Sequence, residues 1–343
     1  MVTPTNTFHF GTAEIWTKYS ELQHYTDAKG LKGILESQTL FATHFRDLND
    51  STELKLLPDR ISKFIQPSIK KIIRDKTKDS FNLKRLLRKQ GGLEKASTDI
   101  AKNFSTIRSQ AAFSSIGNIP PMTSPFITSF CGYDDGTYEF AHGLLSQWRG
   151  YAQGGFAIIF DTRKLWELCQ NETERYAYTT IMLDEVVYDD DEAKFDEEVR
   201  PFLKIIERET EAHLNGEELP KLSTEESAGI IAQFARLKHR AFREEHEVRI
   251  AACPITPERY DWMVADKQDV GEYLVKRLRQ SATDASEKTQ IVLFDDPPNS
   301  KLPIKRIIVG PQVNQTEATH FARSLAEKFN IQIVKSETPL VQW

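Results

Sequence analysis

The sequence has few cysteines and no long run of apolar residues. Its 343 residues include three cysteines, Cys131, Cys169 and Cys253, which lie far apart. A small and scattered set of this kind predicts neither a disulfide framework nor a closely spaced metal-binding pair. No segment approaches the roughly 18 apolar residues of a membrane-spanning helix, and the first residues lack the pattern of a signal peptide. We therefore expect a cytoplasmic protein with no metal and no membrane partner.

Several familiar catalytic and nucleotide-binding motifs are also missing. There is no Gly-x-Gly-x-x-Gly and no Gly-x4-Gly-Lys-Ser/Thr, which excludes the standard nucleotide loops. The Gly-x-Ser-x-Gly elbow of hydrolases is absent, and His246 lacks the second histidine of the zinc-peptidase helix motif. The net charge is −5, so no overall positive field favours nucleic acid.

Composition and hydrophobic periodicity predict a soluble protein of helices and strands. Hydrophobic residues make up 39% and charged residues 28%, an ordinary globular balance. The spacing of apolar residues predicts strands at 39–43, 126–131, 155–160, 178–188, 247–253, 289–294, 304–309 and 331–334. It predicts helices at 25–37, 190–215, 223–243, 269–279 and 315–329. Their irregular alternation favours an α+β fold with a mixed or antiparallel central sheet.

A long helical segment carries a dense positive surface. Residues 52–115 look helical, with breaks expected at Pro58, Pro67 and Gly91-Gly92. A run of basic residues is most often the solvated face of packed helices. It is also the electrostatic footprint that phosphate-bearing partners select. Nucleic acid is therefore a candidate partner through Lys70, Lys71, Arg74, Lys84, Arg85, Arg88 and Lys89.

The best candidate for chemistry is the run Glu245-His246-Glu247-Val248-Arg249. In an extended strand, Glu245, Glu247 and Arg249 face the same side. Two carboxylates on one face raise each other's pKa, and a nearby cation opposes that rise. Beside a cleft, such a pair suits acid–base work or the stabilisation of positive charge. On pattern alone, an exposed strand face with an ion pair is the commoner explanation.

Two other clusters have structural explanations that are commoner than functional ones. Trp148 and Tyr151 are three residues apart and share one face of a helical turn, which is typical of core packing. The nearby Gly154-Gly155 pair allows close backbone approach by a ligand or another segment. His24 stands beside Tyr25, and a lone histidine next to an aromatic is more often a packing residue than a catalyst.

Taken in order, these segments resemble the bacterial domain-of-unknown-function family 2971 over about residues 20–335. The matching elements are His24-Tyr25-Thr26, 49–53, Ser129-Phe130-Cys131, 148–152, 155–160, Lys238 with Glu245, Glu247 and Arg249, and 307–311. Ser51 and Cys131 replace residues usual in the family. The resemblance implies one family domain over residues 1–343 with a basic helical insertion at 52–118, of which residues 54–115 carry no family motif.

The layout also resembles that of the ADP-ribosyltransferases, with a His on the first strand, a Ser or aromatic on a middle strand and a Glu on a late strand. This resemblance implies their α+β fold and NAD as substrate. Glu247 would accept the 2′-hydroxyl of the nicotinamide ribose and stabilise the positive charge that builds as nicotinamide leaves. Glu245 would orient or deprotonate the acceptor.

The same resemblance supplies a set of residues around NAD. His24 would bind the adenosine ribose, Tyr25 or Tyr151 would stack on a ring, and Arg149 would reach the diphosphate. The full set of expected NAD-binding residues is His24, Tyr25, Ser129, Trp148, Arg149, Tyr151 and Arg249.

Three classes of function remain open at the level of the sequence. The leading one is an NAD-consuming enzyme that passes ADP-ribose to protein, nucleic acid or water, in a bacterial defence or toxin-like system. The second is a non-catalytic ligand- or partner-binding module of the same fold. The third is a metal-dependent nuclease that uses Asp50, Lys238, Glu245 and Glu247.

Overall fold

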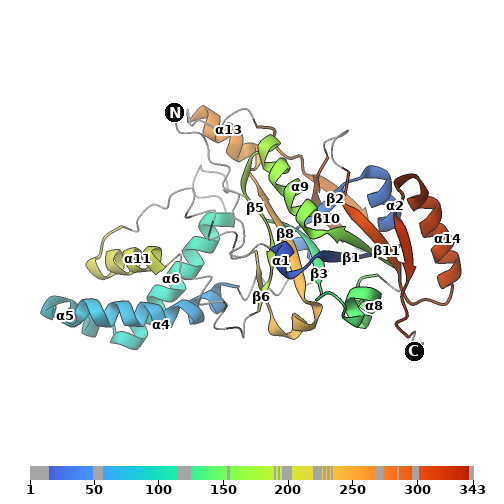
Figure 1. Ribbon diagram of the computed structural model, residues 1–343. Coiled ribbons are helices and arrows are strands. Elements are labelled where there is room, and N and C mark those ends of the chain that lie inside the picture. The colour runs from blue at the N-terminus through green and yellow to red at the C-terminus, as the bar shows by residue number, and fades with distance from the viewer. Residues whose placement is uncertain are drawn as a thin grey trace.

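A large, mostly antiparallel β-sheet forms the centre of the fold (Figure 1). The computed structural model describes residues 15–48, 57–113, 125–152, 155–188, 191, 194, 203–218, 226, 229, 232, 235–266, 273–283, 286–295 and 301–339. In these ranges ten strands join one sheet, in which only β11 (Ile304–Val309) and β12 (Gln332–Lys335) pair in parallel. The expected α+β class with a mixed or antiparallel sheet is confirmed.

Strand β3 (Phe126–Gly132) is the branch point of the sheet. It pairs along most of its length with β8 (Glu247–Pro254). On its other edge, its first residues pair with β2 (Leu40–His44) and its last residues with β1 (Glu21–Thr26). In the described chain no strand pairs with residues 128–130 on that edge. The sheet therefore splits between β1 and β2, opposite the middle of β3.

The remaining strands extend the sheet on both sides of this split. Beyond β1 lie β4 (Phe156–Asp161), β11 and β12. Beyond β2 lie β10 (Ser286–Leu293) and β9 (Arg279–Thr283), while β5 (Tyr178–Glu185) pairs with the far edge of β8. Both faces of β4 and β8 are buried, which explains the apolar run of β4 and that of residues 250–253 in β8.

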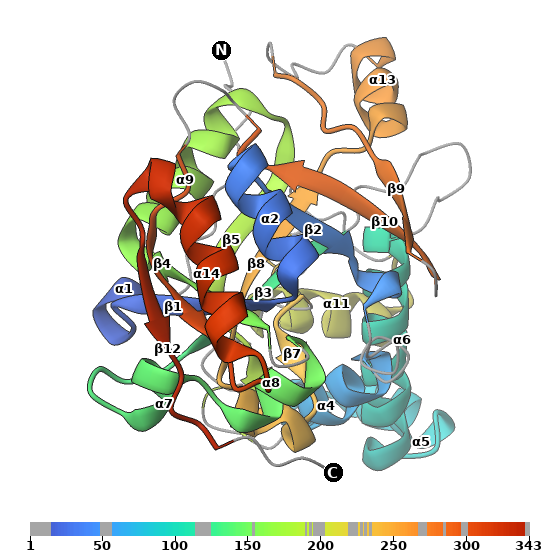
Figure 2. The ribbon, with the colours of Figure 1, turned by 90° about the vertical axis from the view of Figure 1, so that its right-hand side faces the viewer.

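Helices cover the sheet and complete its main core. Helices α2 (Ala28–Ser37) and α14 (Gln315–Ala326) lie side by side over one face (Figure 2). Helix α9 (Thr162–Arg175) contributes Leu165 to the same core, where it joins Leu31, Leu35 and Phe160. Each fully buried side chain of this size stabilises the fold by about 1.5–3 kcal/mol, so the sheet is a rigid base for any site built on it.

The basic helical segment has a core of its own. It contains α4 (Leu57–Thr77), α5 (Phe81–Lys89) and α6 (Leu93–Phe113), and α11 (Leu203–Asn215) packs against α4 and α6 from much later in the chain. Ile65, Ile69 and Ile206 are buried among these helices. These helices project to one side of the sheet (Figure 1). Residues 52–56 and 114–118 lie outside the described chain.

Of the two expected proline breaks in this segment, the one at Pro67 is wrong, and the residues before α4 that would test the one at Pro58 lie outside the described chain. Pro58 lies in the first turn of α4, where proline is tolerated. Pro67 lies inside α4, which continues through it. An interior proline costs about 3 kcal/mol, and burial of Ile65 and Ile69 on either side offsets that cost. The break at Gly91 and Gly92 is confirmed, because both adopt positive φ angles between α5 and α6.

Three predicted helices need correction. Tyr25 belongs to β1, and α2 begins only at Ala28, after the capping residue Asp27. The helix expected up to Arg243 has already ended before β7 (Leu237–Lys238), which pairs with β6 (Val187–Tyr188) and leads into the 3-10 helix η3 (Arg240–Glu245).

The third error lies at residues 269–279. The described residues 273–279 form no helix: Leu274 makes an isolated bridge with Tyr176, and Lys276 forms a buried ion pair with Glu172. The helix in this part of the chain is α13 (Pro257–Ala265). Among the helices that the structure describes, none is long and apolar enough to cross a membrane.

Candidate active site

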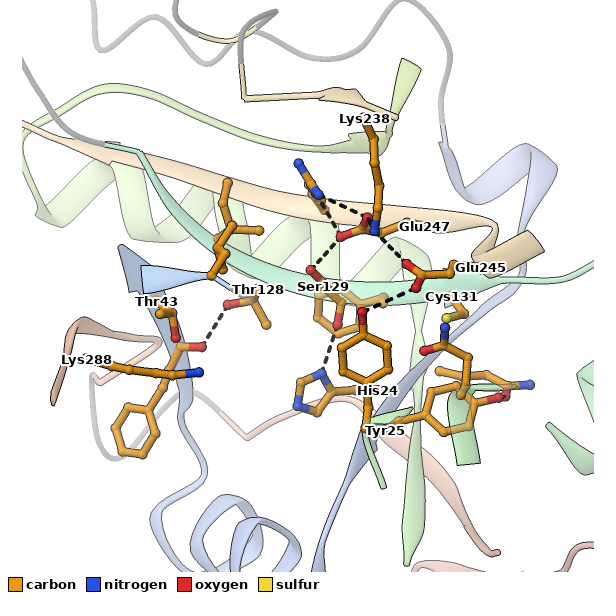
Figure 3. Close-up of a pocket in the computed structure, with 18 residues that line it drawn as sticks. His24, Tyr25, Thr43, Thr128, Ser129, Cys131, Lys238, Glu245, Glu247 and Lys288 are labelled. Atoms are coloured by element: carbon orange, nitrogen blue, oxygen red, sulfur yellow. Dashed lines mark hydrogen bonds and ion pairs between the residues drawn. The ribbon is translucent and has the colours of Figure 1, made fainter. Parts of the chain in front are cut away.

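A pocket opens where β1 and β2 diverge from each other, beside the middle of β3 (Figure 3). Its volume is about 220 Å³, and its walls include His24, Ser129, Glu245 and Glu247. Ligand pockets commonly measure roughly 300–1,000 Å³. A ligand larger than a mononucleotide must therefore extend beyond the enclosed part of this pocket.

Glu247 is the first residue of β8, and its carboxylate is fully engaged. Oε1 accepts hydrogen bonds from Ser129 Oγ at 2.6 Å and Arg249 Nε at 2.7 Å. Oε2 accepts from Lys238 Nζ at 2.6 Å and Arg249 Nη2 at 3.1 Å. A carboxylate has about four acceptor positions, so these four donors saturate it. The residue is 5% exposed, and its position is fixed by contacts from three segments of the chain.

The pKa of Glu247 shows the opposing effect that was expected of a nearby cation. Burial raises the pKa of Glu247, but the neighbouring Arg249 and Lys238 outweigh burial and lower this pKa to about 2. Glu245 has little influence on this pKa because Arg249 and Lys238 contact the Glu247 carboxylate directly. Glu247 is therefore ionised throughout the physiological pH range.

Glu245 does not lie on the strand with Glu247, as the alternating pattern had predicted. It ends η3, and His246 then adopts a left-handed conformation with φ 45° before β8 begins. The two carboxylates are nevertheless joined by Lys238, whose Nζ lies 2.5 Å from Glu245 Oε2 and 2.6 Å from Glu247 Oε2. Burial lowers the pKa of Lys238, but the attraction of Glu247 and Glu245 raises it overall. This cation holds the two buried carboxylates together.

His24 reaches the same group of residues from β1. Its Nδ1 lies 2.9 Å from the carbonyl oxygen of Ser129. Because a carbonyl can only accept, Nδ1 carries the hydrogen. Burial lowers the pKa of His24, so the neutral ring leaves Nε2 as a hydrogen-bond acceptor. Ser129 thus connects His24, through its carbonyl, to Glu247, through its hydroxyl.

The structure places the two tyrosines differently. Tyr151 is 44% exposed at the pocket rim, and its hydroxyl donates to Glu245 Oε1 at 3.2 Å. Tyr25 also lines the pocket. Its hydroxyl donates to Gln23 and accepts from the backbone N–H of Leu144, so it is engaged in packing. Tyr151 is therefore the tyrosine whose hydroxyl is positioned beside the carboxylates.

Trp148 and Arg149, both expected to bind NAD, are not among the residues that line the pocket. Trp148, in α8 (Leu145–Gly150), is 1% exposed and packs against the Tyr25 ring at a centroid distance of 4.8 Å. Arg149 is on the exposed side of the same short helix. Arg249 lines the pocket but donates to Glu247 and to the carbonyl of Ala235. It holds the carboxylate in place and does not extend into the cavity as an anion receptor.

Sequence reasoning gave too small a role to Lys238 and missed the β2 and β10 wall. Lys238 belonged to the family motif, and only the nuclease alternative used it as a site residue. Phe41, Thr43 and Lys288 line the pocket, yet they belong to no motif. Over the ranges that the structure describes, no group of three or more His, Cys, Asp or Glu side chains is arranged to hold a metal ion. Asp50, the other acid of the nuclease alternative, lies outside those ranges.

The low pKa of Glu247 predicts a specific acid sensitivity. A folded-state pKa of about 2 lies below the ordinary value near 4.5, so the stabilisation from this carboxylate is fully present above about pH 4.5 and is lost as the pH falls toward 2. Glu247→Gln removes that titration. We expect the variant to be less stable at pH 7 and to lose less further stability than the wild type between pH 5 and 3. Urea unfolding across this range measures the difference, and parallel pH curves would contradict the assignment.

The comparisons with known proteins give one match. Residues 147–250 match the model of the family described as "Protein of unknown function (DUF2971)". The matched stretch contains Tyr151, Lys238, Glu245, Glu247 and Arg249, and it confirms the family resemblance seen in the sequence. Neither the curated proteins nor the solved structures gave a match.

Proposed function

We propose that this member of the DUF2971 family is an NAD-consuming enzyme that cleaves the bond between nicotinamide and ribose and passes ADP-ribose to an acceptor. The observation that supports the proposal is a line of contacts across three neighbouring strands. His24 on β1 contacts the carbonyl of Ser129 on β3, whose hydroxyl contacts Glu247 on β8. These are the residue types that the ADP-ribosyltransferase resemblance requires, and they meet in one pocket.

Glu247 suits the stabilisation of the sugar during this reaction. As the C1′–N bond breaks, its electron pair goes to the nicotinamide ring, and positive charge builds on the ribose. A fixed, ionised carboxylate stabilises that charge without reorganising. Because four donors already saturate Glu247, a ribose 2′-hydroxyl must replace one of them. The Ser129 hydroxyl is neutral and can rotate away, whereas Arg249 and Lys238 are held by charge.

Two neighbouring groups suit the substrate and the acceptor. Nε2 of His24 accepts a hydrogen bond from a ribose hydroxyl, because Nδ1 carries the ring hydrogen. Glu245 has capacity for a further donor, since Oε1 receives Tyr151 and Oε2 receives Lys238. It takes the proton of the attacking water or acceptor as the new bond to C1′ forms.

The test is the release of nicotinamide from NAD by the purified protein, followed by chromatography. Parallel reactions contain water alone, a mixed protein substrate, single-stranded RNA or single-stranded DNA. We expect release above the rate of NAD alone in at least one of them. Absence of release in all four reactions would reject the enzymatic proposal.

The saturation of Glu247 also favours a second function, a non-catalytic NAD-binding module. If the four donors are never displaced, the pocket can hold a ligand without turning it over. In that case NAD raises the melting temperature of the protein and is recovered intact. Stabilisation together with nicotinamide release would exclude this alternative.

Nucleic acid is the acceptor class that the basic helices favour. Between residues 70 and 89, six exposed cations on α4 and α5 have no carboxylate partner within the described part of the chain: Lys71, Arg74, Lys84, Arg85, Arg88 and Lys89. Lys70, by contrast, pairs with Glu94. The ring of Phe81, at the start of α5, is 78% exposed beside these charges. Cations that follow a backbone together with an exposed ring are typical of single-strand binding.

This acceptor class predicts salt-dependent binding of single-stranded RNA. Replacing Arg85 and Arg88 by Gln should weaken binding about tenfold and reduce the slope of log affinity against log salt by about 1.4, at ~0.7 per lost phosphate contact. Fluorescence anisotropy with a labelled oligonucleotide measures both quantities. Replacing Arg163 and Lys164 on α9 by Gln is the matched control, because it changes the net charge equally. An equal loss in the control, or binding insensitive to salt, would contradict the prediction.

A further inference from the structure

A second wall of the pocket carries no motif but has a defined chemical character. Strands β2 and β10 pair antiparallel, with Phe41 opposite Val292 and Thr43 opposite Gln290. Paired residues and alternate residues of a strand share a face, so Phe41, Thr43, Lys288 and Gln290 lie on one face. The amide of Gln290 donates to Thr43 Oγ1 at 3.2 Å on that face. Phe41, Thr43 and Lys288 line the pocket.

The aromatic ring on this wall is open and is reinforced by a cation. Phe41 is 42% exposed, although large apolar side chains in strands are usually buried. Arg279 of β9 stands opposite Gln290, and its guanidinium carbon lies 4.5 Å from the centroid of the Phe41 ring. An exposed ring held by a guanidinium is a platform on which a nucleobase can stack.

The two ends of the pocket carry different side chains. Glu245 and Glu247 lie at one end, Lys288 and Thr43 lie at the other, and His24 and Ser129 lie between them (Figure 3). At about 220 Å³, the enclosed volume is too small for a whole dinucleotide. A dinucleotide with its nicotinamide ribose at the carboxylates must therefore continue toward the β2–β10 face.

The β2–β10 wall also supplies a cation for the diphosphate. The family resemblance assigned the diphosphate to Arg149, which does not line the pocket. Lys288 lies on the wall where the diphosphate of such a ligand would pass, and Arg279 is on the same face. A lysine ammonium and a threonine hydroxyl are ordinary donors to phosphate oxygens.

We propose that the β2–β10 face is a nucleotide subsite, in which Lys288 and Thr43 bind the diphosphate and Phe41, supported by Arg279, stacks on the base. Its assignment to NAD rests on the proposed function. The chemistry that it recognises is a nucleoside diphosphate, which can be tested without turnover. The nicotinamide end of the substrate then points to Glu245 and Glu247.

The probe is ADP, and isothermal titration calorimetry measures its affinity for the full chain. We expect Lys288→Gln and Phe41→Ala each to weaken ADP binding about tenfold, the usual effect of losing a charge-assisted contact or a stacked ring. The matched controls are Lys335→Gln, on the far edge strand β12, and Tyr138→Ala, an exposed ring on α7 (Tyr138–His142) that does not line the pocket. Both controls should bind ADP like the wild type. Denaturant midpoints verify that all four variants are folded, and Phe41 is exposed enough to be replaced.

The outcomes separate the subsite from the proposed reaction. Wild-type protein that does not bind ADP at millimolar concentration, or equal affinity in the subsite and control variants, would overturn the subsite. ADP binding that depends on Lys288 and Phe41, in a protein that releases no nicotinamide, would support the subsite while rejecting the enzyme. If the protein releases nicotinamide but neither change alters its ADP affinity, the enzyme is supported and the subsite is rejected.

Discussion

Replacing Glu247 by Gln is expected to lower nicotinamide release from NAD by about 100- to 1,000-fold, the usual effect of removing one charge-stabilising group from an active site. The amide keeps the size of the side chain but has no negative charge to oppose the charge on the ribose. It also places an NH₂ group where Glu247 now accepts from Ser129, Lys238 and Arg249. Initial rates at saturating NAD measure the effect, and a rate equal to that of the wild type would contradict the role of Glu247.

The matched control for this change is Glu172→Gln. Glu172 is also 5% exposed and also pairs with a buried lysine, Lys276, but it does not line the pocket. Both variants break a buried ion pair and lose stability. Only Glu247→Gln should lose activity once the assay temperature is well below both melting temperatures. Equal loss in the two variants would mean that the effect reports stability and not chemistry.

Replacing Lys238 by Met should destabilise the protein by about 3–5 kcal/mol, because removal of one partner leaves buried charge without compensation. Lys238 is 5% exposed and contacts both Glu245 and Glu247. Without it, two buried carboxylates face each other with only Arg249 nearby. Urea unfolding at pH 7 measures the loss.

A second substitution distinguishes this electrostatic account from simple loss of packing. Glu245→Gln in the Lys238→Met background removes one of the two opposed charges and should recover much of the lost stability. In an otherwise wild-type chain the same change should be destabilising, because it breaks the ion pair with Lys238. A double-mutant cycle gives the interaction energy directly. Additive effects of the two changes would contradict the account.

The sequence was most informative where local pattern and tertiary structure agree. The strand expected at 304–309 is observed as β11, and the helix expected at 315–329 is α14 followed by a short 3-10 turn. Failures occurred where distant contacts override local pattern. The predicted helix began at Tyr25, but Tyr25 belongs to β1, which forms because it pairs with all of β4. Residues 273–279 form no helix, and Lys276 is held there by Glu172 and Asp295.

The candidate site shows the same division between local and distant information. The ADP-ribosyltransferase resemblance gave His24, Ser129 and Glu247 roles toward the same substrate but left open whether they share a pocket. The strand order β1, β3 and β8 brings them into one pocket. The pattern could not predict that His246 turns in the left-handed conformation and removes Glu245 from the strand. Nor could it predict the β2–β10 wall, since Thr43 and Gln290 are 247 positions apart and meet only through sheet pairing.

The most direct test of the central claim is a crystal structure of the wild-type protein with a non-hydrolysable carbocyclic analogue of NAD. The account predicts that the nicotinamide-bearing ring lies between His24 and Glu247, with its 2′-hydroxyl in the place of the Ser129 hydroxyl. It further predicts the diphosphate beside Lys288 and the adenine on Phe41. The account would be contradicted if the analogue bound elsewhere. It would also be contradicted if the pocket stayed empty at saturating analogue, with all four donors still on Glu247.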